Sequence, residues 1–181
     1  MNSIIKPEPA LEAEGLDLFK TLLKNSQCYL EYGCGGSTVY ACNVALVKSV
    51  ISVDTDEKWI KAVLASVDRK ISKVEVVFCD LGEVENWGFP KSEEKVHDFW
   101  KYMVSPWEVS KKLDLSPDVI LIDGRFRVAS FLYSLINAQA GTIILFDDYS
   151  LRPHYFVVEE FCGLNQLCGR MGLFWLRTHI L

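Results

Sequence analysis

The ten residues YLEYGCGGST, at positions 29–38, constrain the fold more than any other stretch of the chain. An apolar run leads to Glu31, and three glycines then occur within four positions. Ser37 and Thr38 follow, and either can cap the helix that the next residues can form. This order predicts a strand, a tight glycine turn and the start of a helix. Glycine permits positive φ and close approach to the main chain, and free N–H groups at the helix start face the turn, so we expect a nucleotide-like ligand there.

The apolar pattern beyond this turn predicts an α/β fold. Helical spacing of apolar residues predicts helices over residues 10–25, 37–46, 57–70, 105–113 and 127–139. Short, continuous apolar runs lie between these segments, which is typical of a parallel sheet covered by helices on both faces. Toward the C-terminus we expect a helix over residues 153–161 and then an antiparallel hairpin around Gly169 and Arg170.

Length and composition favour one cytoplasmic domain over residues 1–181. Half of the residues are hydrophobic, which supplies a sizeable core. The net charge of −5, without a basic run, disfavours extended binding to nucleic acid. No apolar run is long enough to span a membrane, and the N-terminus lacks the pattern of a signal peptide. The six cysteines form no C-x-x-C pair, which is typical of free thiols in a reducing compartment.

Two stretches lack a regular apolar pattern. Residues 1–9 contain Pro7 and Pro9, and we expect them to form a loose lead-in to the first helix. Residues 81–105 are too long for an ordinary connection, so a functional or mobile loop is expected there. The aromatic residues in and after this loop could belong to the core, form a lid over a ligand or make a homodimer contact; they are Trp87, Phe89, Phe99, Trp100, Tyr102 and Trp107.

Acidic residues end five consecutive strand-like runs; they are Glu31, Asp54, Asp80, Asp123 and the pair Asp147 and Asp148. Each alone could form a turn or cap a helix, and Asp56 is expected to cap the helix that follows it. Together they indicate one rim, because ligands in open α/β sheets bind beyond the carboxyl ends of the strands. Asp54 lies about twenty residues beyond the glycine turn, where a carboxylate can accept hydrogen bonds from both ribose hydroxyls of a nucleotide.

The spacing of the glycines separates two kinds of cofactor. A dinucleotide fingerprint has glycines at its first, third and sixth positions, whereas the sixth position from Gly33 is Thr38. An NAD(P)-binding oxidoreductase is therefore the less favoured enzyme. Glu31, Gly33 and Gly35 instead resemble the E-x-G-x-G first motif of class I S-adenosylmethionine (SAM) methyltransferases, with Ser37 in place of the usual third glycine. An acid-rich rim also suits the positive charge of a sulfonium cofactor.

The resemblance covers most of the chain from residue 28 onward. The segments similar to a subgroup of these methyltransferases are EYGCGGST at 31–38, WGFP at 87–90, DGRFR at 123–127 and DDYSLRPHY at 147–155. The resemblance implies SAM as the cofactor and a Rossmann-like, mostly parallel sheet that ends in an antiparallel hairpin. It also implies that Asp80 lies by the adenine amino group and that Glu31 lies near the amino-acid end of the cofactor. The implied cofactor-binding residues are Glu31, Gly33, Cys34, Gly35, Ser37, Thr38, Asp54, Asp80 and Asp123.

Three residues are candidates for chemistry at the methyl acceptor. Asp123 or Asp147 could orient or deprotonate an acceptor oxygen or nitrogen, while methyl transfer itself depends largely on positioning. Arg125 could bind an acidic acceptor through bidentate contacts. Two possibilities stay open for Arg125 and equally for the other three arginines of the rim, namely binding an acidic acceptor or pairing with the aspartates; the other three are Arg127, Arg152 and Arg170.

A metal ion is an alternative that the pattern favours less. Asp123, Asp147 and Asp148 resemble the acids of metal-dependent catechol-type O-methyltransferases, and their oxygens suit magnesium. Asp148 stands where that family has asparagine, and Phe126 stands where it has lysine, so we assign no metal ligand. We expect a SAM-dependent methyltransferase that acts on a small-molecule acceptor. A non-catalytic binding or scaffold domain with the same fold stays open.

Overall fold

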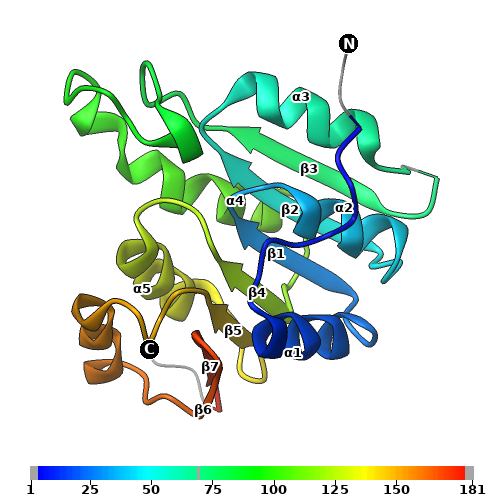
Figure 1. Ribbon diagram of the computed structural model, residues 1–181, viewed down its shortest axis with the longest axis vertical. Coiled ribbons are helices and arrows are strands. Elements are labelled where there is room, and N and C mark those ends of the chain that lie inside the picture. Colours follow the sequence, from blue (N-terminus) through cyan, green and yellow to red (C-terminus); the bar gives the residue numbers. More distant parts are fainter. Residues whose placement is uncertain (1–3, 69, 178–181) are drawn as a thin grey trace.

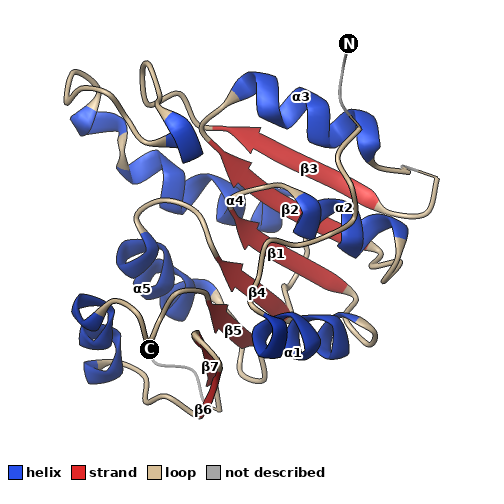
Figure 2. Ribbon diagram, in the orientation of Figure 1, coloured by secondary structure: helices blue, strands red, loops and turns tan. Residues whose placement is uncertain are grey.

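The computed structural model describes residues 4–68 and 70–177, and within these ranges seven strands form one sheet in the order β3-β2-β1-β4-β5-β7-β6 (Figure 1). The strands are β1 (Cys28–Tyr32), β2 (Ser49–Asp54), β3 (Lys73–Phe78), β4 (Val119–Ile122), β5 (Ile143–Phe146), β6 (Gln166–Cys168) and β7 (Met171–Trp175). Strands β1 to β5 are parallel, β7 is antiparallel to β5, and β6 is antiparallel to β7. The mostly parallel sheet with a C-terminal antiparallel hairpin is therefore confirmed, and Figure 2 shows its strands among the helices.

Helices cover both faces of this sheet, as the apolar pattern predicts. One face carries α1 (Ala13–Leu23), α2 (Gly36–Asn43) and α3 (Glu57–Ser66), and the other carries α4 (Trp100–Lys112) and α5 (Arg127–Asn137) (Figure 1). Short 3₁₀ helices are η1 (Asn86–Gly88), η2 (Val96–Asp98) and η3 (Pro153–Glu160). No helix in the described ranges is long and apolar enough to cross a membrane.

All six predicted helices differ from the observed ones by one or more residues at an end, and three of them differ most in extent or type. Helix α4 begins at Trp100 rather than at residue 105, so the irregular connection is shorter than expected. Helix α3 ends at Ser66, because Val67 is extended, and does not reach residue 70. The segment that was predicted as a helix over 153–161 is a 3₁₀ helix that ends at Glu160.

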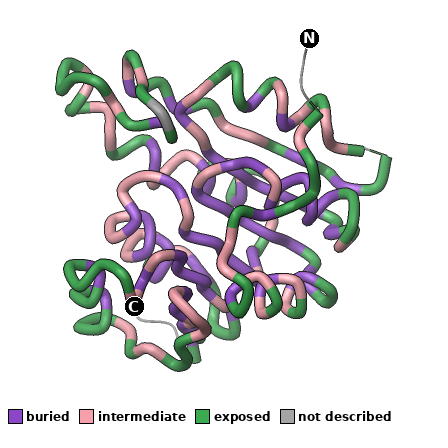
Figure 3. Tube along the Cα trace, in the orientation of Figure 1, coloured by how far each residue is buried: buried purple, intermediate pink, exposed green. Residues whose placement is uncertain are grey.

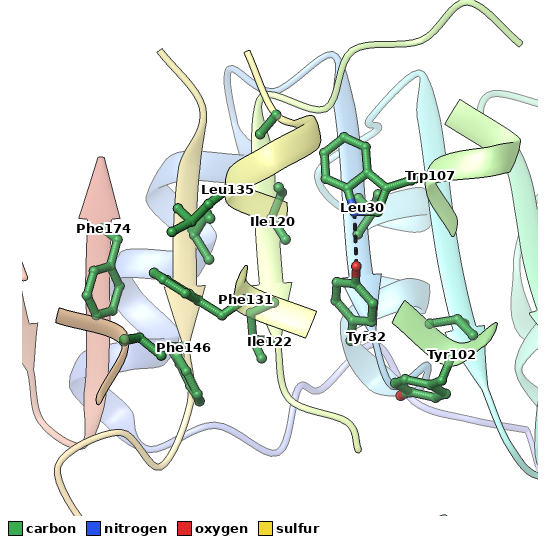
Figure 4. Close-up of a cluster of buried hydrophobic side chains, with 14 of the residues drawn as sticks. Leu30, Tyr32, Tyr102, Trp107, Ile120, Ile122, Phe131, Leu135, Phe146 and Phe174 are labelled. Atoms are coloured by element: carbon green, nitrogen blue, oxygen red, sulfur yellow. Dashed lines mark hydrogen bonds between the residues drawn. The ribbon is translucent and has the colours of Figure 1, made fainter. Parts of the chain in front are cut away.

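Side chains of the central strands alternate between two apolar cores. Leu30, Ile122 and Phe146 pack toward α4 and α5, whereas Tyr29 and Leu121 pack toward α1 and α2. Figure 4 shows the first core, where Trp107 Nε1 donates a hydrogen bond of 3.0 Å to Tyr32 Oη. Figure 3 shows the central strands as buried and much of the outer helices and loops as exposed. The sheet is thus a rigid base for the loops at the carboxyl ends of its strands.

The first described residues run across the start of α2. Ile5 N donates a hydrogen bond of 2.8 Å to Ser66 Oγ at the end of α3. A Cβ atom at Gly36 would collide with the carbonyl oxygen of Glu8, so the two main chains touch there. Residues 4–9 form no helix or strand, and residues 1–3 of the predicted lead-in lie outside the described ranges. This N-terminal segment therefore reaches the glycine turn.

Asp56 caps α3, as its position after β2 predicts. Its Oδ1 accepts hydrogen bonds from the backbone N–H groups of Lys58 at 2.8 Å and Trp59 at 3.1 Å. We expect Asp56→Ala to lower the free energy of unfolding by about 1 kcal/mol, because both N–H groups lose their partner. Urea unfolding measures the change, and Asp56→Ser, which keeps a capping oxygen, should stay close to the unmodified protein. Equal losses in the two variants would contradict the capping role.

Candidate functional site

The candidate site lies beyond the carboxyl ends of β1, β2 and β4, where a cavity of about 1160 Å³ opens. Its lining comes from the N-terminal segment (residues 4–11), the glycine turn (33–37), the end of β2 (54–56), the segment 84–91 and the end of β4 (123–125). Trp59 and Tyr102 complete the wall. A cavity at this edge is where ligands of open α/β sheets bind.

The structure brings seven of the predicted site residues to this cavity, namely Gly33, Cys34, Gly35, Ser37, Asp54, Asp123 and Arg125. It places the other four outside the lining, namely Glu31, Thr38, Asp80 and Asp147. Sequence analysis did not identify Trp59 or the N-terminal segment as parts of the site. Trp59 lies at helical spacing and resembles a core residue, and its Nε1 donates a hydrogen bond of 2.7 Å to the carbonyl oxygen of Cys34.

Two glycines let the end of β1 approach the end of β4. Gly33 has a φ of 93°, in the left-handed region that side chains disfavour. A Cβ atom on Gly33 would lie 3.0 Å from Gly124 Cα, and one on Gly124 would lie 2.8 Å from Gly33 N. Gly35 has more room, since its nearest neighbour would be Trp59 at 3.6 Å. The turn is therefore fixed on the sheet side and open toward the cavity.

Glu31 lies beneath the glycine turn and is fully buried. Its carboxylate accepts hydrogen bonds from Tyr29 Oη at 2.8 Å, Ser37 Oγ at 2.6 Å and Ser52 Oγ at 2.6 Å, and also from the hydroxyl of Thr38. Burial raises the pKa of Glu31, and these hydroxyl donors oppose the rise. With four donors on its two oxygens, Glu31 holds the turn and helix α2 to β2 and does not reach the cavity surface.

Thr38 belongs to the same buried group. It is fully buried, and its Oγ1 accepts a hydrogen bond of 2.9 Å from Gly35 N while it donates to Glu31. The N-cap residue of α2 is Gly35, so neither Ser37 nor Thr38 takes the capping position that the sequence predicted. Thr38 instead holds the N–H of Gly35 from within the first turn, and Ser37 lines the cavity. The sequence motif thus divides into residues that shape the turn and residues that face a ligand.

Asp54 connects the glycine turn to the end of β2. Its Oδ2 accepts a hydrogen bond of 3.0 Å from Cys34 N, and its Oδ1 accepts from Thr55 N at 2.7 Å and Asp56 N at 3.1 Å. Burial raises the pKa of Asp54, and the hydrogen bonds from the backbone oppose the rise. Asp54 also lines the cavity, so its carboxylate holds the wall and faces any ligand.

Asp80 does not reach this cavity. Its carboxylate forms an ion pair with Lys95 and accepts a hydrogen bond of 3.0 Å from Gly82 N. The ion pair lowers the pKa of Asp80, and the residue lines a separate hollow between β3 and α4. The segment 84–91 covers the end of β2 instead, where Thr55 Oγ1 donates a hydrogen bond of 3.0 Å to the carbonyl oxygen of Gly88.

Asp123, Asp147 and Asp148 lie together with two arginines. Arg127 contacts Asp123 Oδ1 at 2.9 Å and Asp148 Oδ2 at 3.2 Å, and Arg170 Nε contacts Asp147 Oδ1 at 3.2 Å. Burial raises the pKa of Asp123, Arg127 opposes the rise, and the neighbouring aspartates add to it. Asp147 is 2% exposed and does not line the cavity, so Asp123 is the aspartate of this cluster that faces a ligand.

The donor set of this cluster does not fit a magnesium ion. Guanidinium groups of Arg127 and Arg170 already occupy the carboxylates that a metal would need. Within the described ranges no three histidine, cysteine or acidic side chains are arranged to hold a metal ion. The three aspartates are therefore matched to two guanidinium groups and not to a metal ion.

Comparison with known proteins places this geometry in a family. Neither a family model nor a curated protein sequence matches the chain. Among solved structures, a methyltransferase-like protein from Silicibacter pomeroyi matches with 31% identity and a TM-score of 0.85, over 96% of this chain and 90% of that protein.

More distant structures share the fold alone. A ribosomal protein L11 methylase from Lactobacillus delbrueckii subsp. bulgaricus has 15% identity and a TM-score of 0.54, over 98% of this chain and 86% of its own. A candidate O-methyltransferase from Klebsiella pneumoniae has 17% identity and a TM-score of 0.52, over 94% of this chain and 84% of its own. The chain has the class I methyltransferase fold and belongs to the family of methyltransferase-like proteins.

Proposed function

We propose that this protein is a SAM-dependent methyltransferase that methylates an oxygen or nitrogen of a small-molecule acceptor. The observation that carries the proposal is the hydrogen bond of 3.0 Å between Cys34 N and Asp54 Oδ2, which joins the glycine turn to the acid of β2 at one cavity wall. The glycine turn, which exposes its main chain, therefore lies on the same cavity wall as Asp54, whose carboxylate can bind ribose hydroxyls. The solved relative is described as a methyltransferase-like protein, which supports the same reading.

The cavity residues fit the two polar ends of SAM. Gly33, Gly35 and Ser37 would hold its amino-acid end along the turn, and Asp54 would accept hydrogen bonds from the ribose hydroxyls. When bound, SAM supplies a methyl group on a positively charged sulfur. The acidic lining favours that positive charge. The cavity of about 1160 Å³ is larger than the roughly 300–1,000 Å³ typical of ligand sites, so it leaves room for an acceptor beside the cofactor.

Asp123 is the residue proposed to act on the acceptor. Burial raises the pKa of Asp123 to about 7. The positive charge of Arg127 opposes this rise, and the neighbouring Asp147 and Asp148 add to it. A carboxylate with such a pKa can accept a proton from an acceptor hydroxyl or amine near neutral pH. Asp147 would act indirectly, because its contacts with Arg170 and Arg127 fix the cluster around Asp123.

We expect Asp54→Asn to weaken SAM binding at least about tenfold, because the amide replaces one oxygen acceptor and removes the charge. Calorimetric titration with SAM and with NAD measures the affinities, and circular dichroism checks the fold. Asp80→Asn is the matched control: it removes an acid of the same rim that lies outside the cavity, so SAM affinity should not change.

The other outcomes assign a different function. Binding of NAD instead of SAM would identify an NAD(P)-binding protein. A folded protein that binds neither ligand would favour a scaffold domain and overturn the proposal. Loss of SAM affinity in Asp80→Asn but not in Asp54→Asn would mean that the cofactor lies elsewhere on the rim.

A further inference from the structure

Arg125 differs from the other arginines of the rim because, among the described residues, no acidic side chain pairs with it. Arg127, Arg152 and Arg170 each form ion pairs with the aspartates of the cluster. In the part of the chain that the structure describes, Arg125 forms no ion pair, and its buried Nε has no hydrogen-bond partner. Burying part of a charged group without a partner is costly, so such a group usually has one in the working protein.

The main chain around Arg125 is held firmly. Arg125 N donates a hydrogen bond of 3.2 Å to Tyr102 Oη, and Tyr102 is 1% exposed. The next residue, Phe126, has a φ of 52° in the left-handed region and packs 5.1 Å from the ring of Phe99. The left-handed turn at Phe126 directs Arg125 and Arg127 to different places. Arg125 lines the cavity, whereas Arg127 is buried in the aspartate cluster.

The guanidinium group of Arg125 is also positioned. It lies 5.3 Å from the centre of the Phe89 ring, in the segment that covers the end of β2. Stacking on an aromatic face restrains the planar group and leaves its N–H edge free for a ligand. Of the other cations that line the cavity, Lys91 pairs with Glu83 at 3.2 Å, and Lys6 lies on the exposed N-terminal segment.

We propose that Arg125 binds a carboxylate of the ligand held in this cavity, with Phe89 as the platform beneath its guanidinium group. A planar fork of N–H donors matches the two oxygens of a carboxylate. The carboxylate can belong either to the amino-acid end of SAM or to an acidic acceptor. The inference rests on the proposed function for the identity of the cofactor, while the carboxylate site itself can be tested without methyl transfer.

The experiment compares Arg125→Gln with Arg152→Gln in calorimetric titrations. Arg152 is the matched control, because it lies on the same rim, pairs with Asp148 and does not line the cavity. The first pair of probes is SAM and methylthioadenosine, which lacks the amino-acid end. The second pair is benzoate and its neutral analogue benzamide, titrated into protein with and without SAM. Circular dichroism confirms that each variant is folded.

Each source of the carboxylate gives its own result. If the cofactor supplies the carboxylate, Arg125→Gln lowers the affinity for SAM at least about tenfold, because a charge-assisted hydrogen-bonded pair is lost. The affinity for methylthioadenosine stays unchanged. If an acceptor supplies it, SAM affinity is unchanged, benzoate binds better than benzamide, and Arg125→Gln removes the difference. Arg152→Gln changes neither affinity.

The inference is overturned if Arg125→Gln and Arg152→Gln bind all four probes alike. The same holds if both variants weaken every probe equally, because the effect would then be structural or a general effect of charge. Failure of the proposed function is a separate result. In that case the unmodified protein does not bind SAM, while benzoate binding that depends on Arg125 would still support the carboxylate site.

Discussion

Arg127→Met is expected to lower the free energy of unfolding by about 3–5 kcal/mol, because it removes the ion pair of Asp123 and one of the arginines that contact Asp148 in a largely buried cluster. Arg127 is 7% exposed and contacts the side chains of Asp123 and Asp148. Its guanidinium group also donates to the carbonyl oxygens of Gly124 at 3.2 Å and Asp147 at 2.6 Å. Arg127 also donates to the carbonyl oxygen of Asp123 at 3.2 Å. Methionine fills much of the space but offers no donor, so two carboxylates and three carbonyl groups lose hydrogen bonds together.

Arg152→Met is the matched control for that loss. Arg152 is about half exposed in its side chain and contacts the same Asp148 at 3.4 Å. An exposed ion pair contributes only about 0–1 kcal/mol, so the control should unfold at nearly the same urea concentration as the unmodified protein. Similar losses in the two variants would contradict a special role for the buried arginine.

The loss in Arg127→Met should also depend on pH. Burial already raises the pKa of Asp123, and removing Arg127 takes away the charge that opposes the rise. The folded variant then binds a proton more tightly than the unfolded chain does. Its deficit relative to the unmodified protein should be largest well above pH 7 and should shrink as the pH falls through about 7, the pKa of Asp123 with Arg127 present, because below that pH Asp123 is protonated in both folded proteins. Urea unfolding at pH 8 and pH 5 compares the two conditions, and an equal deficit at both would show that the carboxylates are not the cause.

Most of the fold could be predicted because its signals are local. The glycine turn of residues 33–36 and the apolar runs of the strands depend on residues close in sequence, and the predicted hairpin at Gly169 and Arg170 joins β6 to β7. The start of α4 could not be predicted in the same way. The apolar spacing placed that start at residue 105, whereas the helix begins at Trp100 and contains Pro106, a residue that helix interiors disfavour.

The pairing of charges within the site depends on contacts that no local pattern describes. Acids at the ends of five strands predicted one rim, but Asp80 pairs with Lys95 from the irregular segment and lies outside the cavity. Arg125 and Arg127 are two residues apart and look equivalent in sequence. The left-handed conformation of Phe126, which lies between Phe99 and Tyr102, puts one in the cavity and the other in the aspartate cluster.

The second large effect is expected at Glu31. Glu31→Ala should lower the free energy of unfolding by at least about 3 kcal/mol, since each buried hydroxyl that loses its acceptor costs about 1–3 kcal/mol. The hydroxyls of Tyr29, Ser37, Thr38 and Ser52 all donate to this carboxylate, and the residue is fully buried. The substitution also opens a cavity beneath the glycine turn, which adds to the loss.

Glu31→Gln separates the support of the turn from the filling of space. Glutamine keeps the volume and one oxygen acceptor, but its amide group offers donors to hydroxyls that already donate. We expect a smaller loss of stability than in Glu31→Ala, together with weaker SAM binding, because Ser37 and Thr38 position the turn through this carboxylate. Urea unfolding and calorimetric titration measure the two effects on the same preparation. If Glu31→Gln kept full stability and full SAM affinity, the buried carboxylate would not be what holds the glycine turn to β2.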